Sequence, residues 1–330
     1  MKKIFLMLAL SVSLFTLTGC NKFNDKDAIS KLKTDNKKTT SYIITADMEI
    51  MSNEEKYTYD VSVNYKEGPL YKVILTNKNN SHTQIILKNK DGVYVITPSL
   101  NKSFKFQSMW PNNSSQSYIP EIILKDILSD NNRVFKCDKE LCDFTTKVNY
   151  PNNKNLSYQK ITYDKNMALK KVIVFDKDGN AQITVKIKTF EKNKDINDEL
   201  FLLSSNVKES AKEETTSKLE SAIYPMYLPV GSTFQKEEIV NNDSKERIIL
   251  TFTGEKSFIL VEELSNVSKE FEVASADGEL VFYENILGTL TDTSINWTSN
   301  GKDYYLIGQN LSKEELLKVA SSTYLAGSTK

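Results

Sequence analysis

The sequence is poor in the residues on which most enzymes and metal sites depend. It contains one histidine, His82, and three cysteines, and it has no Gly-x-Ser-x-Gly turn, no His-Glu-x-x-His pair and no glycine-rich phosphate loop. A single histidine leaves few groups for acid–base chemistry or for tetrahedral zinc coordination. We expect His82, in the run NNSHTQIIL, to be a structural residue on the surface at a strand edge. The sequence therefore predicts a protein that is not an enzyme and uses no metal or cofactor.

The chain also lacks an excess of charge of either sign. Its 43 basic residues balance 43 acidic residues. Proteins that bind nucleic acid need a basic excess or patch to neutralise phosphates, so we expect no nucleic acid among the partners. Hydrophobic residues make up 39% of the chain, which is enough for a packed core, and a length of 330 residues favours two domains over one.

Long apolar runs are missing except at the N-terminus. Residues 4–17 carry no charge, but at about 1.5 Å per helical residue they span only ~21 Å, less than the hydrocarbon core of a bilayer. Lysines before this run and small residues after it predict a secretory signal peptide over residues 1–19. The segment Leu17-Thr18-Gly19-Cys20 resembles the bacterial lipobox. Cys20 would then carry a lipid that anchors the protein outside the cell membrane, and the alternative is an ordinary signal peptide with an incidental cysteine.

The other two cysteines, Cys137 and Cys142, lie in the stretch RVFKCDKELCDFTTKV. If the flanking segments form a hairpin, the loop over residues 138–141 places the two cysteines opposite each other and close enough to bridge. An extracytoplasmic location permits a disulfide there. The alternative is a pair of free buried thiols.

Alternation of apolar and polar residues predicts many strands. The clearest run is YTYDVSVNY, in which every second residue is a tyrosine or valine, so that one face of the strand lies on a core. Close spacing and turn signals such as Asp91-Gly92 favour an antiparallel sheet. The expected strands of this region are residues 42–51, 57–65, 71–77, 83–89, 92–97, 102–108, 134–136, 143–150, 156–164, 169–176 and 181–190.

Fewer segments have helical spacing. Residues 117–129 carry isoleucines at helical intervals, with Pro120 early enough to start a helix. Near the C-terminus, Ser312 and Glu315 predict a capping box, and Leu311 and Leu316 predict the hydrophobic staple around it.

A polar stretch divides the chain. We expect a first domain over residues 20–205, a linker or solvated helix over residues 206–221, and a small α+β domain over residues 222–330. Strands are expected at residues 247–253 and 256–262 of the last domain, with a terminal helix packed on a small sheet.

Several of these stretches resemble a known family. A signal with a lipobox, a helix near residues 27–33 and the run DGVYVITPSLNKSFKF are similar to the lipoprotein-carrier fold of the LolA type, shared with RseB-like regulators. The tail, with YPMYLPVGS and INWTSNGKDYYLIGQNLSKEELLKVASS, resembles the small C-terminal domain of YdcC-like sporulation lipoproteins and GerS-like germination lipoproteins of Gram-positive spore formers. The resemblance covers nearly the whole mature chain, but the cysteine pair at 137 and 142 has no place in it.

This resemblance implies a mainly-β fold with some α: a half-open antiparallel β-barrel wrapped around helices, plus the small α+β domain. In relatives the apolar concave face holds acyl chains or a peptide partner. In this chain that face would be lined by Tyr57, Tyr59, Val61, Val63 and Tyr65, with Met109 and Trp110 at its rim. The alternative is that the same aromatic stripe is plain core.

Two functions follow from this fold. The first is a membrane-anchored extracytoplasmic lipoprotein that binds a lipid or another apolar ligand in the concave face of the sheet. The second is a non-catalytic scaffold that binds and regulates an envelope protein, such as a cell-wall hydrolase, during sporulation or germination. A large apolar cavity favours the first function, whereas a filled interior with an exposed apolar patch outside it favours the second.

Overall fold

The computed structural model describes residues 23–52, 55–206, 219, 221–242, 245–265 and 272–327. The predicted signal peptide over residues 1–19, Cys20 and most of the predicted linker lie outside these residues. Within the described ranges, no helix is both long enough and apolar enough to cross a membrane.

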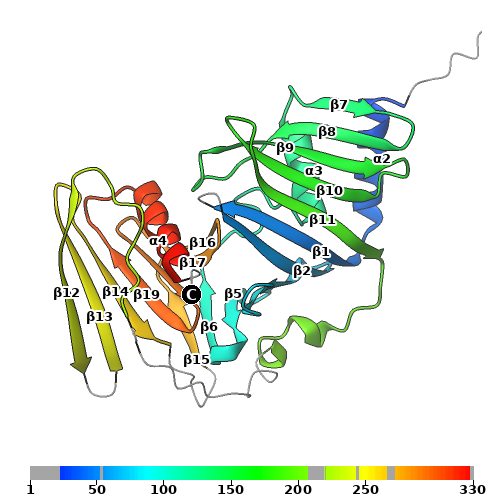
Figure 1. The fold of residues 1–330 in the computed structure, drawn as a ribbon. Coiled ribbons are helices and arrows are strands. Elements are labelled where there is room, and N and C mark those ends of the chain that lie inside the picture. Colours follow the sequence, from blue (N-terminus) through cyan, green and yellow to red (C-terminus); the bar gives the residue numbers. More distant parts are fainter. Residues whose placement is uncertain are drawn as a thin grey trace, which may run out of the picture.

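Two sheets make up most of the structure (Figure 1). The first has twelve strands in the order β15-β6-β5-β4-β3-β2-β1-β11-β10-β9-β8-β7. Neighbouring strands are antiparallel except for β15 and β6, which are parallel. In chain order the strands are β1 (Ser41–Ser52), β2 (Glu55–Lys66), β3 (Leu70–Asn77), β4 (Thr83–Asn89), β5 (Gly92–Thr97), β6 (Lys102–Phe106), β7 (Val134–Cys137), β8 (Leu141–Lys147), β9 (Leu156–Asp164), β10 (Leu169–Asp176), β11 (Ala181–Lys192) and β15 (Glu272–Ala276).

The alternation in β2 explains which face of this sheet is buried. Tyr57, Tyr59, Val61 and Val63 are at most 7% exposed, whereas Asp60 between them is exposed. Because directly opposed residues on paired strands share a face, the cross-strand neighbours of these residues on β1 and β3 are buried on the same side. The sheet therefore has one continuous apolar face, which we call the concave face.

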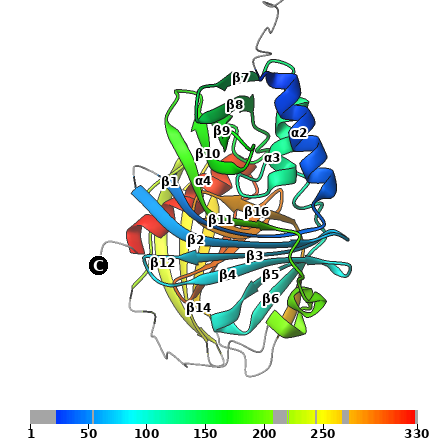
Figure 2. The same ribbon diagram turned by 90° about the vertical axis from the view of Figure 1, so that its right-hand side faces the viewer.

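Two helices cover part of the concave face. α2 (Asp25–Lys38) begins with a capping box between Asn24 and Asp27, and α3 (Pro120–Ser129) begins with a proline, which has no amide hydrogen to leave unpaired. Both lie across the β7–β11 half of the sheet (Figure 2). Their apolar residues, which include Leu32 and Ile123, join the same core as β1 and β2.

Short 3₁₀ helices cover part of the other face. η1 (Pro98–Leu100) follows β5, and η2 (Asp198–Phe201) and η3 (Ser204–Asn206) follow β11. Phe201 and Ile196 pack with Leu87 and Ile96 in a separate small core over β4 and β5.

The second sheet has seven antiparallel strands and one helix, α4 (Lys313–Gly327). The predicted capping box at the start of α4 is confirmed: the Ser312 amide donates to Glu315 Oε2 at 2.8 Å, and the Glu315 amide donates to Ser312 Oγ at 3.3 Å. Leu311 and Leu316 are both buried in the core beneath the helix. The strands, in sheet order, are β12 (Ser232–Asn242), β13 (Lys245–Gly254), β14 (Phe258–Leu264), β19 (Lys302–Ile307), β18 (Ser294–Ser299), β17 (Ile286–Leu290) and β16 (Glu279–Tyr283).

The two sheets are connected by more than the chain. β15 follows the second sheet's β14 in sequence, yet it pairs with β6 and extends the first sheet. Leu280 of β16 and Leu287 of β17 join the core of the first sheet. A largely buried ion pair, Lys102 Nζ to Asp303 Oδ2 at 2.8 Å, also links β6 to β19. We call the second sheet with α4 the second unit, and it is therefore packed against the first sheet.

The predicted fold class is confirmed: the chain is mainly β, its first sheet is curved and open, and helices are few. The predicted strands of the first sheet lie within a few residues of their observed ends. The expectation that His82 lies on the surface is corrected, because its side chain, just before β4, is half-buried and its Nε2 is buried without a hydrogen-bond partner among the described residues. Burial there lowers the pKa of His82.

Candidate functional site

A cavity of about 680 Å³ lies between the two sheets, and we call it the inter-sheet cavity. One wall comes from β1, β4, β11 and residues 110–118, and the other comes from β16, β17 and α4. Figure 1 shows α4 and β16 on the side of the second unit that faces the first sheet. The volume lies within the roughly 300–1,000 Å³ that is usual for small-molecule sites.

The floor of the inter-sheet cavity is apolar. Each of its side chains is at most 7% exposed, and Leu280 and Leu287 from the second unit belong to the same core as the first-sheet residues. The floor residues are Met48, Ile50, Ile86, Trp110, Leu280 and Leu287. An apolar group in the cavity would therefore contact both units.

The mouth of the inter-sheet cavity is polar. Residues 113–117 contribute asparagine, serine and glutamine side chains. Gln116 Nε2 donates to Ser114 Oγ at 2.9 Å, whereas Asn113 Oδ1 is buried and has no hydrogen-bond partner in the described part of the chain. From α4, Lys318 pairs with Glu314 at 2.8 Å. The cavity as a whole is thus amphipathic.

One carboxyl group lies deeper in the inter-sheet cavity. Glu284 stands in the turn between β16 and β17 with a φ of 51°, and Ser52 Oγ of β1 donates to its Oε2 at 2.5 Å. Burial raises the pKa of Glu284 above its ordinary value of 4.5, although hydrogen bonds from Ser52 and Ser321 oppose the shift. Within the described ranges, no three His, Cys, Asp or Glu side chains are grouped as metal ligands. The arrangement suits binding of an amphipathic molecule.

The other end of the concave face, beneath α2 and α3, is filled. Glu121 of α3 accepts hydrogen bonds from Tyr42 Oη at 2.9 Å and from Tyr71 Oη at 2.6 Å. Burial raises the pKa of Glu121 above 4.5 and is also the main cause that raises the pKa of both tyrosines. Tyr65 stacks on Tyr42 with ring centroids 4.8 Å apart. A cavity of about 90 Å³ is lined by Tyr42, Tyr65 and Glu121 at this end.

The predicted ligand face lies on the same side of the sheet as the floor of the cavity. Tyr57 and Tyr59 are the cross-strand neighbours of Ile50 and Met48, respectively, which line the inter-sheet cavity. Tyr57, Tyr59, Val61 and Val63 are packed in the core, and none of the four lines either of the two cavities described above. Tyr65 lines the smaller cavity.

The two predicted rim residues differ. Trp110 is buried at the floor of the inter-sheet cavity and contacts Tyr71 edge to face, with ring centroids 5.7 Å apart. Met109 is 73% exposed and does not line that cavity. Trp110 therefore stands between the filled end of the concave face and the inter-sheet cavity.

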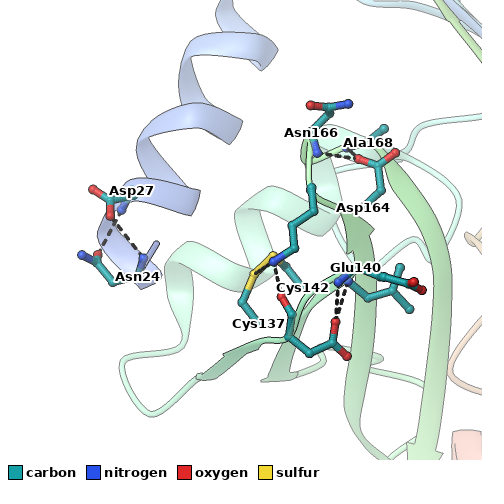
Figure 3. The surroundings of a disulfide bond; sticks show 11 residues. Asn24, Asp27, Cys137, Glu140, Cys142, Asp164, Asn166 and Ala168 are labelled. Carbon is teal, nitrogen blue, oxygen red and sulfur yellow. Dashed lines mark hydrogen bonds between the residues drawn. A yellow bond between two sulfur atoms is a disulfide. The ribbon is translucent and has the colours of Figure 1, made fainter. Parts of the chain in front are cut away.

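The cysteines at 137 and 142 occupy opposed positions at the end of the β7–β8 hairpin, with Cα atoms 4.1 Å apart, and the structure joins them in a disulfide (Figure 3). Phe135 of the same hairpin contacts Phe23, just before α2, with ring centroids 6.2 Å apart. The pair lies at the outer edge of the first sheet, and neither cysteine lines the inter-sheet cavity. Cys20, the predicted lipidation site, lies outside the described residues.

Sequence reasoning missed the contribution of the second unit. The residues of β16, β17 and α4 that line the cavity lie more than 150 positions after the β1 residues that they face. The available signals were the apolar run LVFY at 280–283 and the polar run NNSSQS at 112–117, which directly follows Trp110 and Pro111. Neither signal indicates its partner across the cavity.

Comparison with known families gives two matches along this chain. The profile of the family described as "Sporulation protein YdcC-like" matches residues 1–201, and the domain of unknown function DUF4367 matches residues 222–322. The sporulation protein YdcC of Bacillus subtilis is 37% identical over 326 residues, which cover 97% of this chain and 96% of the relative.

Solved structures resemble the fold at low sequence identity. The MucA/MucB complex of Pseudomonas aeruginosa matches with 11% identity and a TM-score of 0.34, covering 90% of this chain and 96% of that one. A LolA superfamily protein of Nitrosomonas europaea matches with 11% identity and a TM-score of 0.32, covering 54% of this chain and 97% of that one. The identity and coverage of the B. subtilis relative, together with the matching family profile, establish that this chain belongs to the YdcC-like sporulation protein family.

Proposed function

We propose that this protein is an extracytoplasmic, membrane-anchored lipoprotein that holds a lipid or another apolar ligand in the inter-sheet cavity. The observation that carries the proposal is the cavity of about 680 Å³ with its buried apolar floor on the concave face. Burying an alkyl chain there gains roughly 0.8 kcal/mol for each methylene removed from water. The polar mouth provides a place where the head of such a ligand stays hydrated.

The test of ligand binding is to fill the cavity from a half-buried position. Ile183 lines the inter-sheet cavity, and Ile187, four residues on along β11, is half-buried but does not line it. We expect Ile183→Trp to abolish the fluorescence increase of the uncharged probe N-phenyl-1-naphthylamine, and Ile187→Trp to retain it. Thermal midpoints measured for both variants show that each is folded. Absence of a saturable signal in the wild-type protein would contradict the proposal.

Membrane anchoring is tested separately at Cys20. Only the thiol of Cys20 is placed to receive diacylglycerol at that boundary, so Cys20→Ala is expected to abolish incorporation of labelled acyl chains. In detergent phase partitioning, the variant should also move from the detergent phase to the aqueous phase. Continued acylation of the variant would remove the anchor from the proposal, while the cavity test would remain valid.

A second function, binding of an envelope protein, is favoured by one specific observation. The segment before β12 and β12 itself expose large apolar side chains, and β12 is an edge strand of the second sheet. These side chains are Tyr224, Met226, Leu228, Val230, Phe234 and Ile239, of which Val230 is 95% exposed. Exposed apolar patches of this kind occur at protein interaction sites. Loss of sporulation or germination function in Met226→Ser with Val230→Ser, but not in Ile183→Trp, would favour the scaffold over the carrier.

A further inference from the structure

The charged residues around the inter-sheet cavity are unequal in sign. Three lysines and two glutamates line it, and they come from four separate parts of the chain. Lys154 lies in the turn between β8 and β9, Lys177 lies in the turn between β10 and β11, and Lys318 lies on α4. Glu314 is also on α4, and Glu284 is the buried acid of the β16–β17 turn.

The three lysines differ in their pairing. Lys318 is paired with Glu314, but within the described residues neither Lys154 nor Lys177 has an ion-pair or hydrogen-bond partner. Both are exposed, and both act on Glu314 from the opposite wall, because their charges help to lower the pKa of that carboxyl. Even with both glutamates counted as charged, the lining holds three lysines against two glutamates. Positive charge is therefore in excess at the mouth.

The mouth also offers a hydrogen-bond acceptor. Asn113 lines the cavity, and its buried Oδ1 has no donor in the described structure. A buried acceptor without a donor costs roughly 1–3 kcal/mol, and a ligand hydroxyl would satisfy it. The cavity thus combines an apolar floor, a polar acceptor and two lysines that have no ion-pair partner among the described residues.

We infer that the inter-sheet cavity selects a single-chain anionic amphiphile. Its acyl chain lies on the floor between Met48 and Leu287, and its carboxylate or phosphate lies between Lys154 and Lys177. A hydroxyl of a glycerol head group, where present, donates to Asn113 Oδ1. This inference rests on the proposed function, because it names the ligand class of the same cavity. The overall charge balance of the chain is compatible with it, since two lysines suffice to select one ligand head group.

The test compares ligands that share one acyl chain and differ in the head. Laurate carries a carboxylate, lauroyl-lysophosphatidylglycerol carries a phosphate, and monolaurin is uncharged. Calorimetric titrations below the critical micelle concentrations would be made on the full exported chain and on Lys154→Gln with Lys177→Gln. The matched control is Lys90→Gln with Lys139→Gln, because these two exposed lysines lie in turns outside the cavity lining.

We expect the wild-type protein and the control to bind at least one of the two anionic ligands about fivefold more tightly than monolaurin, and the cavity variant to lose this preference. Added salt should reduce the difference in affinity between the anionic ligands and monolaurin, because salt screens the charges of exposed lysines. Comparing laurate with the lysophospholipid shows whether a carboxylate or a phosphate is the better head. Equal binding of all three ligands, unchanged in the cavity variant, would overturn the inference and leave the apolar-ligand proposal standing. Failure of every ligand and of the uncharged probe to bind would overturn both.

Discussion

The two ends of the concave face share strands, but they differ in how much space is left above them. At one end, α2 and α3 cover Tyr42, Tyr65 and Tyr71 and leave about 90 Å³ of space. At the other end, the second unit covers Met48 and Ile50 and leaves about 680 Å³. Whether the apolar face of an alternating strand is packed core or lines a cavity therefore depends on how closely the covering element packs against it.

Each end contains a buried glutamate, and the difference between the two is instructive. Glu121 accepts hydrogen bonds from two tyrosine hydroxyls beside the smaller cavity, whereas Glu284 lines the larger one. Burial raises the pKa of both carboxyls. Glu121 and Tyr42 line the cavity of about 90 Å³ and Glu284 lines the cavity of about 680 Å³, so more water can replace the carboxyl of Glu284 than that of Glu121. Of the following four predictions, three test this contrast between a filled end and an open end, and the one at the β7–β8 hairpin concerns a site outside both.

The largest effect is expected from a charge placed in the filled core of β2. Val61 is 2% exposed and does not line either of the two cavities, so Val61→Asp should lower the free energy of unfolding by about 3–5 kcal/mol. Ser62→Asp, on the opposite face of the strand, should change it by less than about 1 kcal/mol. Urea unfolding followed by circular dichroism measures both. A folded Val61→Asp protein that loses only probe binding would place Val61 at an open cavity.

The next effect concerns the enclosed acid. Glu121→Ala removes the acceptor of Tyr42 and Tyr71, and two buried hydroxyl donors without a partner should cost about 2–4 kcal/mol. Glu284→Ala should cost less, about 1 kcal/mol, because Glu284 lines the larger cavity and water can enter the space that its side chain vacates beside Ser52 Oγ. Chemical denaturation of the two variants shows which of them loses more free energy of unfolding. A larger cost at Glu284 would reverse the comparison.

A smaller effect is expected at the β7–β8 hairpin, which lies outside both ends. Closing the short loop between Cys137 and Cys142 should contribute about 2 kcal/mol by the loop-entropy estimate. The double Ser variant should therefore unfold earlier and still bind the probe. Intact mass of the exported protein, before and after reduction and alkylation, reports the oxidation state. Two thiols that alkylate without reductant would show that the bridge is absent.

The smallest effect is a change in how stability depends on pH. The folded protein binds a proton at Glu121 more tightly than the unfolded chain does, because burial raises the pKa of this carboxyl above 4.5. The contribution of Glu121 is therefore fully present below pH 4.5 and is lost as the pH rises through the folded-state pKa. Glu121→Gln should remove this component. Thermal midpoints over the acid-to-neutral range would contradict the assignment if the two curves stayed parallel.

Local pattern in the sequence was sufficient for most of the strands and for the helix starts. The alternation in YTYDVSVNY identified β2 and its buried face, and Ser312 with Glu315 identified the start of α4. These features were predictable because side-chain direction in a strand and capping at a helix start depend on residues a few positions apart. The parallel pairing of β15 with β6 was not predictable in this way, because its two strands are about 170 positions apart.

The sequence by itself determined the apolar face of β2, the hairpin that opposes Cys137 and Cys142, and the signal-like N-terminus, since each is written in neighbouring residues. Only the tertiary structure decided that Tyr57 and Val61 are core while Met48, Ile50 and Trp110 line a cavity. The same is true of Lys154 and Lys177, which the fold brings to one mouth with Glu314. The physical reason is that a cavity is the space that distant elements leave unfilled, and its volume depends on how those elements pack against each other.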